Sequence, residues 1–90
     1  MRPLNQIAAE ILVLWRGVPP TASYKMFSTP YVEAMLDLKT CRDTYGTDHA
    51  DGIVLYALSN MSSWRGPDAK RIKDELQQHL KAHNAHYQGK

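Results

Sequence analysis

The chain has 90 residues, of which 43% are hydrophobic and 22% are charged, and its formal net charge is +2. Such a chain fits one globular domain that can bury a modest core without a disulfide or a structural metal. Its single cysteine, Cys41, excludes an intramolecular disulfide and paired-cysteine zinc or redox motifs. No segment approaches the roughly 18 apolar residues of a membrane-spanning helix, and no cleavable signal sequence is recognisable, so we expect a cytoplasmic protein without membrane contact.

Residues 3–16 are predicted to form the first helix, because their apolar residues recur at spacings of three and four. These residues are Leu4, Ile7, Ala8, Ile11, Leu14 and Trp15. Pro3 suits the first turn, where no backbone N–H is needed, and Gly17 is a candidate left-handed cap at the other end. Glu10 lies on the opposite face and is expected to point outward.

The segment after this helix is the hardest to assign. Two prolines, at positions 19 and 20, prevent the helix from continuing. Residues 21–28 are expected to form a packed loop or one short helical turn, because Tyr24, Met26 and Phe27 are too apolar for full solvation. If these three side chains are exposed, they provide an apolar patch for a homodimer, so the oligomeric state and the conformation of residues 17–29 stay open.

A second helix is predicted for residues 30–40. Thr29 and Pro30 form its start signal, a hydroxyl cap followed by a proline at the first helical position. The expected inner face consists of Tyr31, Ala34, Met35 and Leu38, with Val32 and Leu36 to one side. Residues 41–47 then connect this helix to the next, with Tyr45 and Gly46 as the turn.

The central helix is predicted for residues 48–62, which contain the longest apolar run of the chain. In a helix this run covers nearly the whole circumference, so we expect burial on all sides and a cost of about 2–5 kcal/mol for Leu55→Ala. Asp48 suits the N-cap, and Asp51 is favourable in the first turn. A buried strand is the alternative, but no second strand-like run is available to pair with it.

The last helix is predicted for residues 67–84, after a sharp corner at residues 63–67. Its apolar stripe consists of Ala69, Ile72, Leu76, Leu80 and His83. Together these elements predict an all-α, compact single domain over residues 1–90, with about four helices. The third helix is expected to be central and buried, and the last to be basic and amphipathic.

Familiar catalytic motifs are absent, including the glycine-rich phosphate loop, HExxH and GxSxG. Cys41 could act as a nucleophile if His49 folded back onto it, but a lone cysteine at a helix end is usually a small buried filler. We therefore predict a protein that is not an enzyme and that uses no cofactor.

Three histidines of the last helix have a spacing that zinc sites often use. His79, His83 and His86 can share one helix face, since they are separated by four and three residues. The alternative is a solvated stripe, in which imidazoles are favourable near the negative end of the helix. Because no carboxylate lies in the same turn, we predict no metal site, although the histidine pattern leaves the question open.

The corner at residues 63–67, before the last helix, contains two candidate binding residues. Trp64 and Arg65 could form an exposed aromatic and guanidinium pair that grips a phosphate or a carboxylate of a partner. The structural alternative is that Arg65 and Asn60 bond to loop carbonyls and helix ends, while Trp64 packs beneath the first helix.

Charge gives this corner a second functional interpretation. Residues 64–90 contain six basic and three acidic residues, whereas residues 1–63 contain five basic and six acidic ones. The central helix, the corner and the basic last helix could thus form a helix-turn-helix, with Lys70, Arg71 and Lys73 near a nucleic-acid groove. Acidic residues interleave with these lysines and arginines and would face the same phosphates, which counts against this interpretation.

Several short motifs carry a resemblance to other proteins. They are Pro30-Tyr31, Ala34-Met35, Tyr45-Gly46, the run Ile-Val-Leu-Tyr at 53–56, Leu-Ser-Asn at 58–60, Trp-Arg-Gly at 64–66 and Ile-Lys at 72–73. Over residues 5–82 the chain resembles small uncharacterised all-helical proteins encoded by bacteriophages and integrated mobile elements. The resemblance implies a prokaryotic or phage cytoplasmic accessory protein, and it supplies no activity or site residues.

The predicted function is therefore that of a small accessory protein, not an enzyme, that binds a macromolecular protein partner. The predicted contact residues are Trp64, Arg65, Lys70, Arg71 and Lys73. The alternative is a DNA- or RNA-binding regulator that uses the basic last helix.

Overall fold

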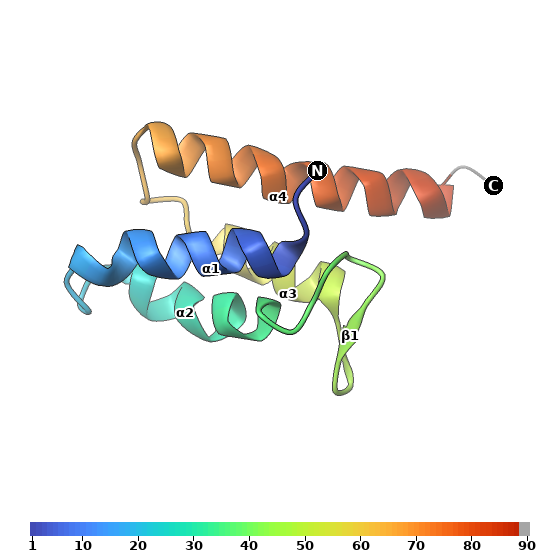
Figure 1. Cartoon of the computed structure of the whole chain (residues 1–90), viewed down its shortest axis with the longest axis horizontal. Helices are drawn as coiled ribbons and strands as arrows, with labels where there is room; N and C mark the ends of the chain where they lie inside the picture. Colours follow the sequence, from blue (N-terminus) through green and yellow to red (C-terminus); the bar gives the residue numbers. More distant parts are fainter. Residues whose placement is uncertain (89–90) are drawn as a thin grey trace.

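The computed structural model describes the backbone of residues 1–88 and the side chains of residues 1–83. In chain order its elements are α1 (Leu4–Leu14), the 3-10 turn η1 (Trp15–Gly17), α2 (Ser23–Met35), β1 (Thr44–Tyr45), β2 (Asp48–His49), α3 (Ala50–Ser59) and α4 (Pro67–Gln88). The prediction of a compact, all-α single domain is confirmed. α2 packs most extensively on α3, and α4 runs antiparallel to α1 with its C-terminal part extending beyond the other helices (Figure 1).

All four α-helices contribute apolar side chains to one core. The fully buried members include Leu4, Ile7 and Ile11 from α1, Val32 and Met35 from α2, Val54 and Ala57 from α3, and Ile72 and Leu76 from α4. Each helix thus buries one stripe of residues at spacings of three and four, and such burial is the main source of stability for helices of this length. Within the described part of the chain, no helix is both long and apolar enough to cross a membrane.

The first helix forms nearly where it was predicted, but its C-terminal end is stabilised differently. The left-handed cap at Gly17 is wrong, because among the described glycines only Gly46 and Gly66 have positive φ angles. Instead, the ammonium group of Lys25 on α2 donates to the carbonyl oxygens of Trp15 (2.8 Å) and Val18 (2.7 Å). A cation from a neighbouring helix thus satisfies carbonyls that a helix end leaves unpaired.

The second helix corrects the prediction for residues 30–40. It begins at Ser23 and ends at Met35, so that Pro30 lies inside it and residues 21–28 are mostly helical. The Thr29 hydroxyl donates back to the carbonyl of Lys25 rather than capping a new helix. Proline removes one N–H from the helix, and the packing of Val32 and Met35 in the core after Pro30, and of Tyr24 against the core before it, offsets this loss.

The buried face of α2 also differs from the prediction. Val32, Met35 and Ser28 are its buried residues, whereas Leu36 is 41% exposed. The Ser28 hydroxyl donates to the carbonyl of Ala57 on α3 over 3.3 Å, so even this buried polar group has a partner. Leu38 is buried as expected, although it lies beyond the helix.

A small antiparallel hairpin precedes α3. Thr44 pairs with His49 and Tyr45 with Asp48, around a turn in which Gly46 has a φ of +62°. The predicted turn at residues 45–46 is present, but the strands were not predicted. Asp48 belongs to β2, so its assignment as N-cap is wrong: the N-cap of α3 is His49, which makes no side-chain capping bond.

The central helix is buried along one side only. Ala50, Ile53, Val54 and Ala57 are its buried residues, whereas Leu55 is 54% and Tyr56 is 59% exposed. The expectation of burial around the whole circumference is therefore wrong at these two positions. α3 packs against α2 and α4, and Leu55 and Tyr56 stay more than half exposed beside these contacts.

The last helix starts at Pro67 as predicted and continues to Gln88, past the predicted end at residue 84. Its buried stripe contains Ala69, Ile72 and Leu76, followed by His79 and His83. Leu80, which was predicted to belong to this stripe, packs against the core but is only partly buried.

Candidate functional site

Trp64, the first of the predicted contact residues, is only 7% exposed. Its ring meets the Trp15 ring edge-on at 5.3 Å and stacks near Tyr24 at 6.2 Å. These contacts join the corner before α4 to η1 and α2, in agreement with the structural alternative for Trp64. Asn60 also bonds locally, since its side-chain amide donates to the carbonyl of Tyr56 over 3.0 Å.

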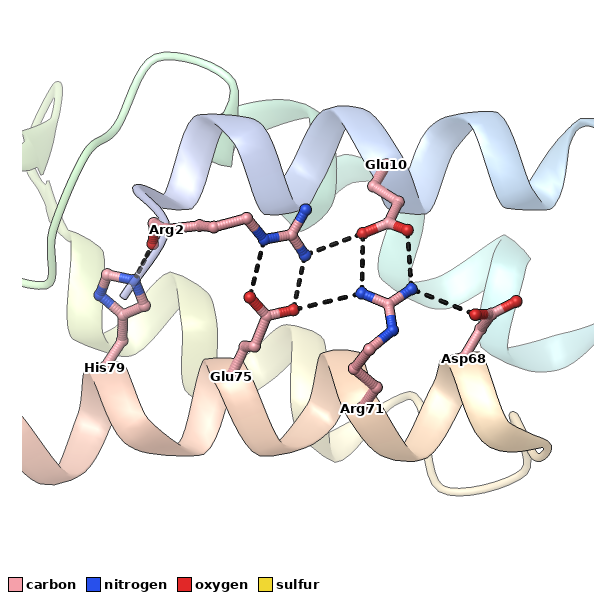
Figure 2. A network of polar contacts seen from close by, with 6 residues as sticks. All are labelled: Arg2, Glu10, Asp68, Arg71, Glu75 and His79. Carbon is pink, nitrogen blue, oxygen red and sulfur yellow. Dashed lines mark hydrogen bonds and ion pairs between the residues drawn. The ribbon is translucent and has the colours of Figure 1, made fainter.

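The Arg71 side chain points from α4 toward α1, where it contacts Glu10 (Figure 2). Its guanidinium donates two hydrogen bonds to the Glu10 carboxylate, at 2.7 and 3.1 Å, and one to Asp68 at 3.1 Å. Glu75 lies 3.6 Å away on the same helix. Contrary to the expectation that Glu10 points outward, it thus connects α1 to α4.

Arg2 completes this network from the N-terminal segment. Its guanidinium donates to Glu75 at 2.5 and 2.7 Å and to Glu10 at 2.8 Å (Figure 2). These cations lower the pKa of Glu10 to about 2, with hydrogen bonds from Arg71 as the largest cause and those from Arg2 next. The pKa of Glu75 is also lowered, mainly by its hydrogen bonds from Arg2. The positive charge of Arg71 is therefore already paired with carboxylates of its own chain.

The other basic contact residues surround a shallow pocket of about 400 Å³, which we call the corner pocket. It is lined by Trp64, Arg65, Gly66, Ala69, Lys70, Lys73 and Asp74. The Lys73 ammonium donates to the carbonyl of Trp64 over 2.5 Å, and burial, followed by the charge of Arg65, lowers its pKa. The structure thus brings four of the five predicted contact residues together and separates Arg71 from them.

A larger hollow that was not predicted lies between α2, the hairpin and α3. It has a volume of about 540 Å³ and a mostly apolar lining, and we call it the α2–α3 groove. It is lined by Pro30, Tyr31 and Ala34 from α2, Tyr45, Asp48 and His49 from the hairpin, and Asp51, Gly52, Ile53 and Tyr56 from α3. Two of the lining rings, those of Tyr31 and Tyr56, stack against each other with centroids 5.6 Å apart and an interplanar angle of 29°.

The charged groups of the α2–α3 groove are acidic. Asp48 and Asp51 line it, and none of its lining residues is a lysine or an arginine. The Asp51 carboxylate lies 3.4 Å from Nε2 of His83 on α4. No cationic group among residues 1–83 contacts the Asp48 side chain. The sequence shows these three tyrosines and two aspartates only as scattered residues of α2, the hairpin and α3, and their convergence depends on the position of α2.

The structure separates Cys41 from His49, the pairing on which a nucleophilic role for this cysteine was predicted to depend. Cys41 is 4% exposed, and burial, followed by the charge of Asp51, raises the pKa of its thiol to about 11. Cys41 lines a separate cavity of about 220 Å³ beside His79 and His83, whereas His49 lies in the α2–α3 groove. A thiol with this pKa is almost entirely protonated at neutral pH.

The histidines of the predicted stripe have different partners in the structure. His79 is buried, and its Nε2–H donates to the carbonyl of Arg2 over 2.7 Å, which anchors the N-terminal segment on α4 (Figure 2). His83 is 9% exposed and faces Asp51, while the side chain of His86 lies outside the described residues. Across residues 1–83, no group of three or more histidine, cysteine or acidic side chains is arranged to hold a metal ion.

Comparison of the chain with protein-family models, curated proteins and solved structures found no match. The resemblance to phage and mobile-element proteins therefore stays a prediction.

Proposed function

We propose that this protein is a small binding protein without catalytic activity, and that a segment of a protein partner occupies its α2–α3 groove. The observation that carries this proposal is the exposure of aromatic surface around a groove of about 540 Å³. Tyr56 is 59% and Tyr45 is 43% exposed, although tyrosine rings are favourable when buried. Tyrosine is also among the residues that contribute most to binding at protein interfaces.

The shape of the groove supports this proposal. Pockets of about 300–1,000 Å³ are typical of sites that hold a ligand or an anchoring side chain. The walls come from three elements, two of which pack closely on one another, so that the groove is largely formed before a partner arrives. A preformed site loses less conformational entropy on binding than one that must be ordered.

The placement of Cys41 supports binding rather than catalysis. Its thiol lies in another cavity, and its raised pKa disfavours the thiolate that nucleophilic chemistry requires. The α2–α3 groove therefore offers surfaces and charges for contact without an activated nucleophile.

Selection of a random peptide display library on the purified protein tests the proposal. We expect enriched peptides to bind the native protein and to lose most of their affinity for Tyr56→Ala. Leu55→Ala is the matched control, because Leu55 is a similarly exposed neighbour on α3 that does not line the groove. Enriched peptides that bind both variants like the native protein, or the absence of any enrichment, would contradict the proposal.

A second candidate function is binding of nucleic acid at the corner pocket. It is supported by the convergence of Arg65, Lys70 and Lys73 beside the start of α4, where the helix dipole also favours an anion. Two features count against it: Asp74 lines the same pocket, and Arg71 is engaged by Glu10.

Fluorescence anisotropy with labelled single- and double-stranded DNA and RNA at several salt concentrations tests this candidate. If it holds, Arg65→Ala and Lys70→Ala each weaken binding and reduce the slope of log K against log salt by about 0.7–0.9. Lys81→Ala is the control, because Lys81 is exposed on α4 away from the corner pocket. Equal affinity of all three variants and the native protein would refute this candidate.

A further inference from the structure

We infer that the α2–α3 groove selects a positively charged side chain, namely a lysine or arginine presented by the partner segment. This inference rests on the proposed function of the groove and adds the chemistry of its occupant. It follows from three features: the aromatic rings at the groove, its two carboxylates, and the apolar surface between them.

The aromatic rings provide the first feature. Tyr31, Tyr45 and Tyr56 come from three different elements and line one hollow, with the Tyr31 and Tyr56 rings stacked against each other. The face of an aromatic ring carries partial negative charge and attracts an ammonium or guanidinium group within about 6 Å of its centroid. Several rings around one hollow allow a single cation to contact more than one of them.

The carboxylates provide the second feature. Asp48 lies at the end of the hairpin and Asp51 in the first turn of α3, and both line the groove. The lining has no lysine or arginine to neutralise them, and Asp48 contacts no cation among residues 1–83. Asp51 also faces His83 at 3.4 Å, so Asp48 is the carboxylate most available to an occupant. An anionic side chain in this position would meet two like charges.

The apolar surface provides the third feature and distinguishes a lysine or arginine from a small inorganic cation. Pro30, Ala34 and Ile53 line the groove together with the tyrosines. Lysine and arginine carry a long aliphatic stem below a charged head, and such side chains place the stem on apolar surface while the head reaches polar groups. The mixture of apolar and acidic groups in the groove matches both parts of this side chain.

Titration of the isotope-labelled protein with small blocked amino acids tests the inference by NMR. The probes are N-acetyl-arginine amide, N-acetyl-lysine amide, and the neutral N-acetyl-citrulline amide, which has nearly the same shape as the arginine probe. We expect the cationic probes to shift the amide signals of residues 45–56 and to bind about fivefold more tightly than the citrulline probe. Equal affinity of the arginine and citrulline probes would overturn the inference.

Two variants locate the selectivity in the groove. Asp48→Asn should weaken binding of the arginine probe about two- to fivefold and leave the citrulline probe unaffected, and Asp48→Glu should restore most of the loss. Tyr56→Leu retains apolar bulk but removes an aromatic ring face, so it should lower the affinity for the arginine probe about fivefold. Leu55→Ala should leave the affinities for both probes unchanged. An unchanged preference for arginine in both Asp48→Asn and Tyr56→Leu would contradict the inference.

The two proposals can fail separately. If library selection yields Tyr56-dependent peptides without basic residues, the groove is a docking site but its selectivity for a cation is wrong. If no Tyr56-dependent peptide is obtained and the arginine probe leaves residues 45–56 unshifted, both proposals are wrong. A second copy of the chain that occupies the groove would instead produce concentration-dependent association in sedimentation experiments, abolished by Tyr56→Ala. This result would overturn the assignment of a partner segment.

Discussion

The ion network between α1 and α4 can be tested by Glu10→Gln, which keeps the shape of the side chain and removes its charge. Glu10 receives hydrogen bonds from Arg2 at 2.8 Å and from Arg71 at 2.7 and 3.1 Å. It is the only member of the network that lies on α1 (Figure 2). After the substitution, both arginines still contact Glu75, so no cation is left without an anionic neighbour.

The expected cost of Glu10→Gln is about 1–2 kcal/mol of the free energy of unfolding at pH 7. The difference between the ordinary pKa of 4.5 and about 2 corresponds to about 3 kcal/mol as an upper limit. Because the Glu10 side chain is 30% exposed, water and salt screen part of this interaction. Exposed ion pairs contribute about 0.2–1 kcal/mol each, and Glu10 makes two.

Urea unfolding followed by circular dichroism at several pH values measures this cost, and urea does not screen charges as guanidinium chloride would. Since the folded-state pKa of Glu10 lies below its unfolded value, its stabilisation is complete above about pH 4.5 and is lost as the pH falls towards about 2. The difference between native protein and variant should therefore shrink as the pH falls and disappear below about pH 2.

Glu33→Gln is the matched control, because Glu33 is exposed on α2 and makes no ion pair with the residues at positions 1–83. We expect the control to change the free energy of unfolding by less than about 0.5 kcal/mol at any pH. Equal effects of Glu10→Gln and Glu33→Gln at pH 7 would refute the role of the network. A cost for Glu10→Gln that persists unchanged at pH 2 would show that the loss has another origin than charge.

Three further predictions concern the core, the backbone and the thiol. Ile72→Ala should lower the free energy of unfolding, measured with urea, by about 2–5 kcal/mol because Ile72 is fully buried. Leu55→Ala should lower it by less than about 1 kcal/mol because Leu55 is largely exposed. Equal losses would contradict the one-sided burial of α3. Gly52→Ala should stabilise α3 by about 0.5–1 kcal/mol because a Cβ there meets no atom within 4 Å, while Gly66→Ala should cost about 1–3 kcal/mol because φ is +113°. If the melting temperatures of both glycine variants shift in the same direction, these two opposite predictions are wrong. Cys41 should react with iodoacetamide at pH 7 far more slowly in the folded protein than in urea, since its thiol is buried with a pKa of about 11, and equal rates would exclude that environment.

The elements that the sequence predicted well are those whose signals are local. α1 and α4 are found near their predicted positions because each combines an apolar stripe with a proline at its start. α2 was misplaced because Thr29 and Pro30 have the sequence of a helix start, yet they lie in the interior of a helix. The choice depended on packing of the segment before Pro30 against α3, which no local signal reports.

The candidate site was predicted in part, and the reason again lies in distance along the chain. Trp64, Arg65, Lys70 and Lys73 are close in sequence, and they do meet in the corner pocket. Arg71, although adjacent to them, is directed to a carboxylate 61 residues away. The α2–α3 groove was not predicted, since its tyrosines converge only after α2 and α3 have packed.

By itself, the sequence determined the all-α class, one amphipathic stripe on each of the terminal helices, the turn at Gly46 and the corner before α4. These features depend on the spacing of apolar residues and on the backbone preferences of proline and glycine, which act over a few residues. Only the tertiary structure decided which apolar residues are covered. Val54 and Leu55 are neighbours in the same apolar run, yet Val54 is fully buried and Leu55 is 54% exposed, because burial depends on which elements pack against a helix and not on the helix alone.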